Sequence, residues 1–265
     1  MEWTDEAIVL SARPHGEAAV VATLLTRSHG RHAGLVPGGR SPRRRGNLQP
    51  GNRVGARWRA RLPEHLGTLT VEPIQTAAAG MLDDPLRLAG LVSACAVAEV
   101  ALPEREPHES VFHGLAALLD AFNSPAWAAA YVRWELGLLQ ELGFGLDLAS
   151  CAATGSNDAL AYVSPRTGRA VSLSAGEPYR DKLLPLPGFL VGQGGGGPAE
   201  VLAGLELTGH FLERNAFQVR VAVESASESL HEPVHPLDHV RVPAPRHVTV
   251  VRLDAIPLLQ VRRQR

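Results

Sequence analysis

Residues 53–62 alternate between apolar and basic side chains, and this stretch constrains the fold more than any other. One set of alternate positions is apolar: Val54, Ala56, Trp58, Ala60 and Leu62. Four of the five positions in the other set are arginine: Arg53, Arg57, Arg59 and Arg61. Side chains of a β-strand point alternately to opposite faces. We therefore predict a strand with one face packed on a core and one face covered by arginine.

Four more short segments of the first 75 residues have the composition of strands. They are apolar and partly β-branched, and Gly- or Pro-containing turns separate most of them. The segments are Ala7–Ala12, Ala18–Thr26, Arg31–Val36 and Leu66–Ile74. Residues 38–46 contain no apolar side chain and are expected to form a loop. Five strands without an intervening helical period predict a small closed barrel.

Positive charge is concentrated in the same part of the chain. Residues 1–75 contain eleven arginines and six acidic residues, a net charge of +5, whereas the other 190 residues hold 15 basic and 21 acidic residues. Such an asymmetry favours a polyanionic partner, most often nucleic acid. Lys182 is the only lysine, so arginine is also the default cation of this chain. That bias explains the residue type but leaves the clustering unexplained.

The basic residues of the first 75 positions are the candidate nucleic-acid site. Arginine grips phosphate with a planar fork and stacks on bases. An arginine face beside the basic 40–45 segment favours a groove that follows a nucleic-acid backbone, although a solvated outer face would look the same in sequence. The candidate set is Arg27, Arg31, Arg40, Arg43, Arg44, Arg45, Arg57, Arg59 and Arg61.

From Asp84 onward the hydrophobic spacing becomes helical, which predicts an α+β protein. Helices are expected at Leu86–Leu102, Glu109–Phe122, from Pro125 to about Leu142, and at Pro198–Arg214. Residues 147–190 look irregular, with a hairpin formed by 159–164 and 169–173. A strand is possible at 219–223, and residues 224–265 resemble a tail or a disordered segment.

An ordered series of motifs resembles the bacterial RecO family of DNA repair proteins. The motifs are Glu6–Leu10, Gly16–Ala18, Leu24–Arg31, Gly38–Arg40, Arg133–Leu139, Leu142–Gly145, Cys151–Gly155, Tyr162–Gly168 and Leu207–Leu212. Each motif alone is weak, but their order over about residues 4–215 is specific. The resemblance implies an N-terminal five-stranded OB-fold over residues 1–80. A helical domain would follow over 81–215 with an irregular insert at about 147–190, and 216–265 would be a tail.

The resemblance also implies a function without catalysis. A RecO-like protein would bind single- and double-stranded DNA, anneal strands, and help load the recombinase on single-stranded DNA in repair. Its expected partners are RecR and the acidic C-terminal tail of the single-strand-binding protein. Arg133 beside Trp134 suits such a tail, because a guanidinium can bind its carboxylate at the rim of an apolar pocket. A local pairing of Arg133 with Glu135 or Glu141 is the equal alternative.

The sequence departs from its resemblance at a zinc site. Many RecO-like proteins carry two Cys-x-x-Cys pairs, whereas here the matching positions are Cys151, Thr154, Ser172 and Ala175. A structural zinc site needs four ligands such as cysteine or histidine. We therefore expect neither zinc nor any other cofactor.

Two other constellations offer rival interpretations. Gly192–Gly197 contains the spelling GxGxxG before a predicted helix, which would suit a nucleotide-dependent oxidoreductase. The further strand–helix units of such a fold are missing. His231, His235, His239 and the neighbouring Asp238 lie close in sequence, but prolines between them break any helix that would align them. A solvated histidine cluster is favoured over a metal site.

Composition also bears on the location of the protein. Cys95 and Cys151 are the only cysteines, so no disulfide framework is expected and a reducing cytoplasm is favoured. The N-terminus is acidic and lacks the apolar core of a signal peptide. The longest apolar stretch, 88–97, is far shorter than the roughly 20 residues of a membrane span. The stoichiometry with RecR, the oligomeric state and the annealing preference do not follow from sequence.

Overall fold

The computed structural model describes residues 1–77, 81 and 83–217. Among these residues the chain forms two compact units, one ending at Trp134 and the other beginning at Glu135. The first unit contains all the strands of the N-terminal region and the two helices that follow them. The predicted boundary between two domains, at residue 80, falls inside the first unit, and the division into separate domains there stays a prediction.

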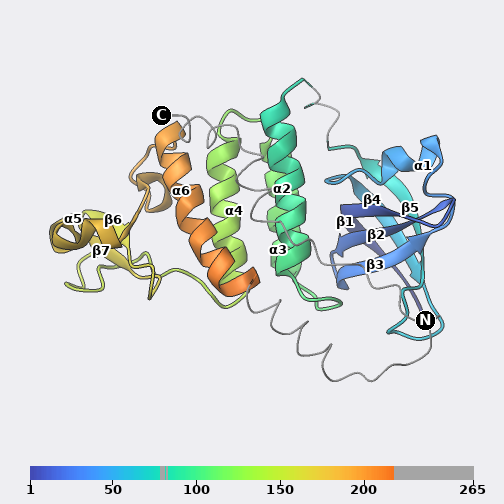
Figure 1. Ribbon diagram of the computed structural model, residues 1–265, viewed down its shortest axis with the longest axis horizontal. Coiled ribbons are helices and arrows are strands. Elements are labelled where there is room, and N and C mark those ends of the chain that lie inside the picture. Colours follow the sequence, from blue (N-terminus) through green and yellow to red (C-terminus); the bar gives the residue numbers. More distant parts are fainter. Residues whose placement is uncertain (78–80, 82, 218–265) are drawn as a thin grey trace. The chain divides into compact units, whose positions relative to one another are not determined.

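The first unit is built around a closed five-stranded barrel (Figure 1). Its strands are β1 (Glu2–His15), β2 (Ala19–Thr26), β3 (Gly30–Val36), β4 (Arg53–Arg59) and β5 (Thr68–Gln75). They close in the order β1-β2-β3-β5-β4, and only the β3–β5 pair is parallel. The predicted OB-like barrel is confirmed, with β1 much longer than the expected segment.

Strand β4 follows the predicted alternation. Val54, Ala56 and Trp58 are at most 2% exposed and join the barrel core, while the arginines between them point outward. The prediction for Leu62 was wrong, because this side chain is exposed rather than in the core. The β1–β4 pairing ends at Arg59, and a turn follows in which the His65 amide donates to the Leu62 carbonyl.

The segment predicted as a loop contains a short helix, α1 (Pro42–Asn47). Pro42 occupies its first turn, where a missing amide proton costs nothing. None of its residues is buried. The helix was missed because an amphipathic pattern is the usual signal, and α1 has no apolar side chain to produce one.

Two helices complete the first unit, α2 (Pro85–Ala101) and α3 (Glu109–Ala121). Asp84 caps α2 by accepting hydrogen bonds from the Leu86 and Arg87 amides, both at 3.1 Å. Near its other end Glu99 accepts a hydrogen bond from Ser11 of β1 at 2.8 Å. This contact joins α2 to the barrel.

Helix α4 (Trp127–Glu141) runs from the first unit into the second, where α6 (Pro198–Phe211) continues as a π-helical turn, Leu212–Phe217. Within the second unit the hydroxyl of Thr208 donates to the buried Glu135 carboxylate. This hydrogen bond gives a partner to one oxygen of a group that is costly to bury alone. No helix in the described ranges has the length and hydropathy to cross a membrane.

The second unit also contains a three-stranded sheet in the order β7-β6-β8. Figure 1 labels its strands β6 and β7. The predicted hairpin forms from β6 (Leu160–Val163) and β7 (Ala170–Ser172), and the two residues of β8 (Leu184–Pro185) were not foreseen. Short helical segments follow at α5 (Leu173–Gly176), Glu177–Lys182 and Gly188–Leu190. The strand proposed at 219–223 lies outside the described residues.

Candidate nucleic-acid interface

The arginine face of β4 is partly neutralised by the neighbouring strand. Arg53 pairs with Glu6, with Nε and Oε1 3.1 Å apart, and Arg57 pairs with Glu2. Both glutamates lie on β1, which is hydrogen-bonded to β4. Arg59 and Arg61 are exposed and make no side-chain hydrogen bond or ion pair with other described residues. The arginines of this face that are available to a polyanion are therefore those at and just after the end of β4, Arg59 and Arg61.

A second basic group lies on and before α1. Arg43 and Arg45 are exposed, and their side chains contact no polar group of the described residues. Arg44 donates to the Pro37 carbonyl, and Arg40 donates to the carbonyls of Gly16 and Glu17, each at 3.1 Å. Arg40 thus ties this segment to the β1–β2 turn, while Arg43 and Arg45 remain able to contact phosphate.

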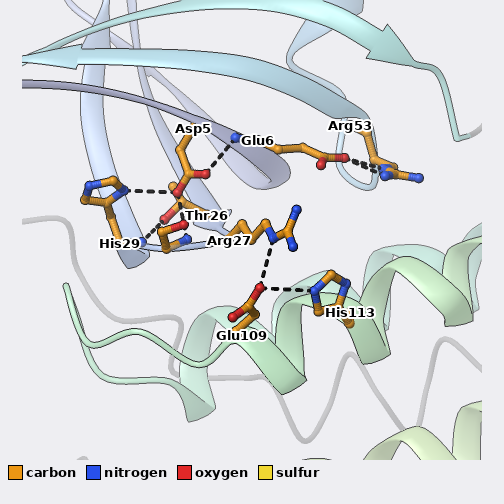
Figure 2. A network of polar contacts seen from close by, with 9 residues as sticks. Asp5, Glu6, Thr26, Arg27, His29, Arg53, Glu109 and His113 are labelled. Carbon is orange, nitrogen blue, oxygen red and sulfur yellow. Dashed lines mark hydrogen bonds and ion pairs between the residues drawn. The ribbon is translucent and has the colours of Figure 1, made fainter.

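Arg27 lies just after β2 and is held by a carboxylate from α3. Its Nε is 2.9 Å from Oε1 of Glu109 (Figure 2). This hydrogen bond raises the pKa of Arg27 and lowers the pKa of Glu109. Both side chains remain about half exposed. Arg27 is accessible to solvent, but the carboxylate of Glu109 partly neutralises its positive charge.

Arg31 is a correction to the predicted set. The residue is only 6% exposed, and its Nε donates to the Leu102 carbonyl at 2.8 Å. A terminal nitrogen lies 3.4 Å from Oε1 of Glu104. Arg31 therefore fastens β3 to the segment after α2 and is not exposed to a DNA strand. Its sequence neighbours gave no sign of this, because both partners lie some seventy residues away.

The β2–β3 turn is fixed by a network around Asp5 (Figure 2). Oδ2 of Asp5 accepts from the Ser28 amide at 2.7 Å and lies 3.0 Å from Nδ1 of His29. The hydroxyl of Thr26 accepts from the His29 amide at 3.0 Å and donates to the Gly30 carbonyl at 2.9 Å. The His29 ring therefore has a defined position at this end of the barrel.

Sequence reasoning missed an aromatic cluster beside that turn. Trp3 and Trp58 are paired across β1 and β4, and their rings stack with centroids 5.8 Å apart. His29 stacks on Trp3 at 4.5 Å, and His32 meets both tryptophans edge-on. The alternation of β4 placed Trp58 correctly in the core. Its pairing with Trp3 needed the strand register, which sequence did not provide.

Comparison with known proteins assigns the chain to a family. Residues 1–77 match the model described as "Recombination protein O N terminal", and residues 82–221 match "Recombination protein O C terminal". A protein of Rhodospirillum centenum described as "DNA repair protein RecO" is 66% identical over 231 residues, covering 86% of this chain and 92% of that protein. The chain belongs to the RecO family.

Other RecO proteins are similar over nearly the same length. That of Caulobacter vibrioides is 56% identical, covering 82% of this chain and 90% of its own. That of Cereibacter sphaeroides is 52% identical, covering 81% and 89%. The resemblance seen in the motifs is thus confirmed, and so is the function it implied at the level of the family. The chain is a non-enzymatic recombination mediator in DNA repair, a role that implies DNA binding.

The residues predicted to bind a RecO partner differ in exposure. Arg133 on α4 is exposed, whereas Trp134 is 7% exposed and packs edge-on against Tyr131. Nε1 of Trp134 has no hydrogen-bond partner among the described residues. Arg133 thus lies at the surface of α4, whereas the neighbouring Trp134 is buried. The pairing of these residues with a peptide stays a prediction.

The positions that match the zinc ligands of RecO-like proteins do not fit zinc. The Ser172 amide donates to Sγ of the buried Cys151 at 3.2 Å, and the Ser172 hydroxyl lies 3.5 Å from the same sulfur. Hydrogen bonds from the Ser172 and Thr154 side chains lower the pKa of Cys151 to about 6. Ala175 offers no ligand atom. One thiol, two hydroxyls and a methyl group are not a donor set for zinc.

The glycine-rich loop of the rival interpretation is occupied by the protein itself. The preceding segment, Gly188–Leu190, is a 3-10 turn rather than a strand. Glu200 of α6 accepts hydrogen bonds from the Gly188 and Gly196 amides at 3.1 and 2.6 Å. The Glu200 carboxylate therefore already takes up two of the backbone donors that an anion could use there. The histidines at 231, 235 and 239 lie outside the described residues.

Proposed function

We propose that this RecO protein anneals complementary DNA strands by holding them through their phosphates. The exposed arginines on α1 and at the end of β4 carry the proposal. Arg43, Arg45, Arg59 and Arg61 are exposed and have no acidic partner among the described residues. Four such cations on one small barrel bind a polyanion regardless of its sequence.

Annealing requires contacts to the phosphates rather than to the bases, because the two strands must pair while they are bound. Contacts to the backbone leave the Watson–Crick edges of the bases free. They also carry no sequence information, so any complementary pair can be joined.

The partners proposed for the protein are RecR and the acidic C-terminal tail of the single-strand-binding protein. The family membership supports these proposals, and the exposed guanidinium of Arg133 supports the second. A carboxylate-ended peptide would gain a charge-assisted hydrogen bond there. Together with DNA binding, these contacts would bring the annealing surface to single strands that are already coated by the single-strand-binding protein.

An annealing assay tests the proposal. Two complementary oligonucleotides are mixed with and without the full-length protein, and duplex formation is followed by fluorescence energy transfer. We expect the protein to accelerate annealing at low salt and to lose this effect as salt rises. Equal rates with and without protein at low salt would contradict the proposal. Binding of a nicotinamide nucleotide, seen by its absorbance, would instead favour an oxidoreductase.

A further inference from the structure

A pocket of about 490 Å³ opens at the end of the barrel where β1 begins. Aromatic side chains from three strands and a turn line it, and a cation from the segment between α2 and α3 faces them. These residues are Trp3, His29, His32, Trp58 and Arg105. The volume lies within the range of about 300–1,000 Å³ that small-molecule sites occupy.

The aromatic wall is ordered by contacts within and behind it. His29 lies nearly parallel to Trp3, at 12°, and Trp3 nearly parallel to Trp58, at 16°. Asp5 holds the His29 ring from behind, and the Trp58 indole donates to the Leu66 carbonyl at 2.9 Å. Gly67 lies so close to this indole that a Cβ there would be 2.4 Å from its nitrogen. The rings are therefore placed before any ligand arrives.

His32 lines the same pocket and has no partner for its polar atoms. It is 4% exposed, and neither ring nitrogen makes a hydrogen bond with the described residues. Burial and the nearby Arg105 charge lower its pKa to about 4, so the ring is neutral near pH 7. A neutral imidazole offers one donor and one acceptor. Such buried, unsatisfied groups are uncommon and call for an explanation.

Arg105 supplies the opposite, cationic wall. Its guanidinium donates to three successive carbonyls, those of Pro63, Glu64 and His65. Its backbone has φ of +61°, a conformation that non-glycine residues rarely adopt. The Arg105 amide also donates to the Arg31 carbonyl at 2.8 Å. These contacts fix a positive charge beside the aromatic rings. Glu2 also lines the pocket, and its negative charge is paired with Arg57.

We propose that this pocket binds one unpaired nucleobase of single-stranded DNA. A base is flat and can stack on the aromatic wall. Its sugar is linked to phosphates, which Arg105 in the pocket wall complements in charge. The inference rests on the proposed function, since the backbone contacts would bring the base to the pocket.

The occupied pocket would distinguish single strands from duplex. A base inside it is out of its stack and out of its pair, so a duplex must break a base pair to enter. The protein would then release DNA at this point once annealing is complete. A protein segment is the other kind of ligand that an aromatic pocket can take, and the experiment separates the two.

Two oligonucleotides of equal length test the pocket: oligothymidylate, and an abasic oligomer with the same phosphates but no bases. Binding of each to the full-length protein is measured by fluorescence anisotropy. We expect Trp3→Leu to weaken oligothymidylate binding about tenfold, equivalent to about 1.4 kcal/mol, and to leave the abasic oligomer unchanged. Trp3→Phe should restore most of the loss. Trp127→Leu, which removes the same ring outside the pocket, should alter neither affinity.

Circular dichroism and thermal melting check the fold of each variant. His29→Ala, which removes the outer ring of the stack, replaces Trp3→Leu if that variant is poorly folded. If Trp3→Leu weakens the binding of both oligomers equally, or of neither, the pocket does not bind a base and the inference is overturned. The proposed function would still stand in that case, provided that the wild type binds the abasic oligomer through its phosphates. Failure of the wild type to bind either oligomer would remove both. If Trp3→Leu binds both oligomers as the wild type does but no longer binds RecR, the pocket belongs to a protein partner and the inference is overturned.

Discussion

Glu109 at the start of α3 holds Arg27, just after β2, with Oε1 of the glutamate 2.9 Å from Nε of the arginine (Figure 2). His113, one turn further along α3, lies 3.4 Å from the same oxygen. Exposed ion pairs of this kind contribute little to stability, because water and salt screen them. Their main effect here is on the charge that the barrel shows to DNA.

Replacing Glu109 by Gln should therefore strengthen DNA binding. The change frees the Arg27 guanidinium and adds one unit of positive charge, so we expect affinity for single strands to rise about two- to fivefold at low salt. The melting temperature should change little. Glu206→Gln, an exposed glutamate on α6, is the matched control. The same gain in both variants would show that total charge, rather than Arg27, is responsible.

Replacing Arg43, Arg44 and Arg45 together by Ala should reduce the salt dependence of binding. Each neutralised phosphate contributes about −0.7 to the log–log slope on single strands. Removal of three contacts should flatten the slope by up to about 2. A variant that lacks Arg166, Arg169 and Arg180 of the second unit controls for charge. Unchanged affinity and slope in the first variant would exclude α1 from the interface.

His32 should make folding stability depend on mildly acidic pH. Its pKa falls from 6.5 to about 4 because of burial, so the unfolded chain takes up a proton that the folded protein resists. Stability should be full above pH 6.5 and fall as pH drops toward 4, by about 2 kcal/mol after allowance for solvent screening.

The variant His32→Phe isolates this effect, because all other titrating groups stay in place. Urea unfolding of both proteins at pH 7 and pH 4.5 measures the difference. The variant should lose less stability on acidification, and at pH 7 it should be as stable as the wild type. An identical loss in both proteins would mean that the His32 ring accepts its proton without cost.

Purified protein should contain no stoichiometric zinc. The sulfur of Cys151 is held by hydrogen bonds from Ser172, and the other matching positions offer no soft ligand. A chelator should leave the melting temperature unchanged. Elemental analysis that finds about one zinc per chain, lost on Cys151→Ser, would contradict this.

Replacing Arg133 by Ala should weaken the binding of an acidic tail peptide more than tenfold. Loss of a charged partner at a desolvated contact typically costs about 2–5 kcal/mol. DNA binding should not change, because the candidate DNA residues lie on the barrel. Arg214→Ala, another exposed arginine on a helical segment, serves as the control. Equal peptide affinity for the variant and the wild type would place the docking site elsewhere.

The sequence predicted best those features that arise from neighbouring residues. The alternation of β4 and the helix at α2 follow from local spacing, and both were correct. The burial of Arg31 depends on the Leu102 carbonyl, 71 residues further on. The stacking of Trp3 on Trp58 depends on strand register. Such long-range contacts leave no periodic signal, so the candidate set included one buried arginine and omitted the aromatic pocket.

The contacts of Arg31 and Arg105 bear on how the protein can be divided for experiments. A fragment ending at residue 77 would keep all five strands but lose the carbonyl and the acid that hold Arg31. It would also lose Arg105, and with it the clamp on the 63–65 turn. Gly30, whose missing Cβ makes room for the Glu106 backbone, would face empty space. A piece that retains these contacts therefore extends at least through Glu106, and shorter fragments would report on a different molecule.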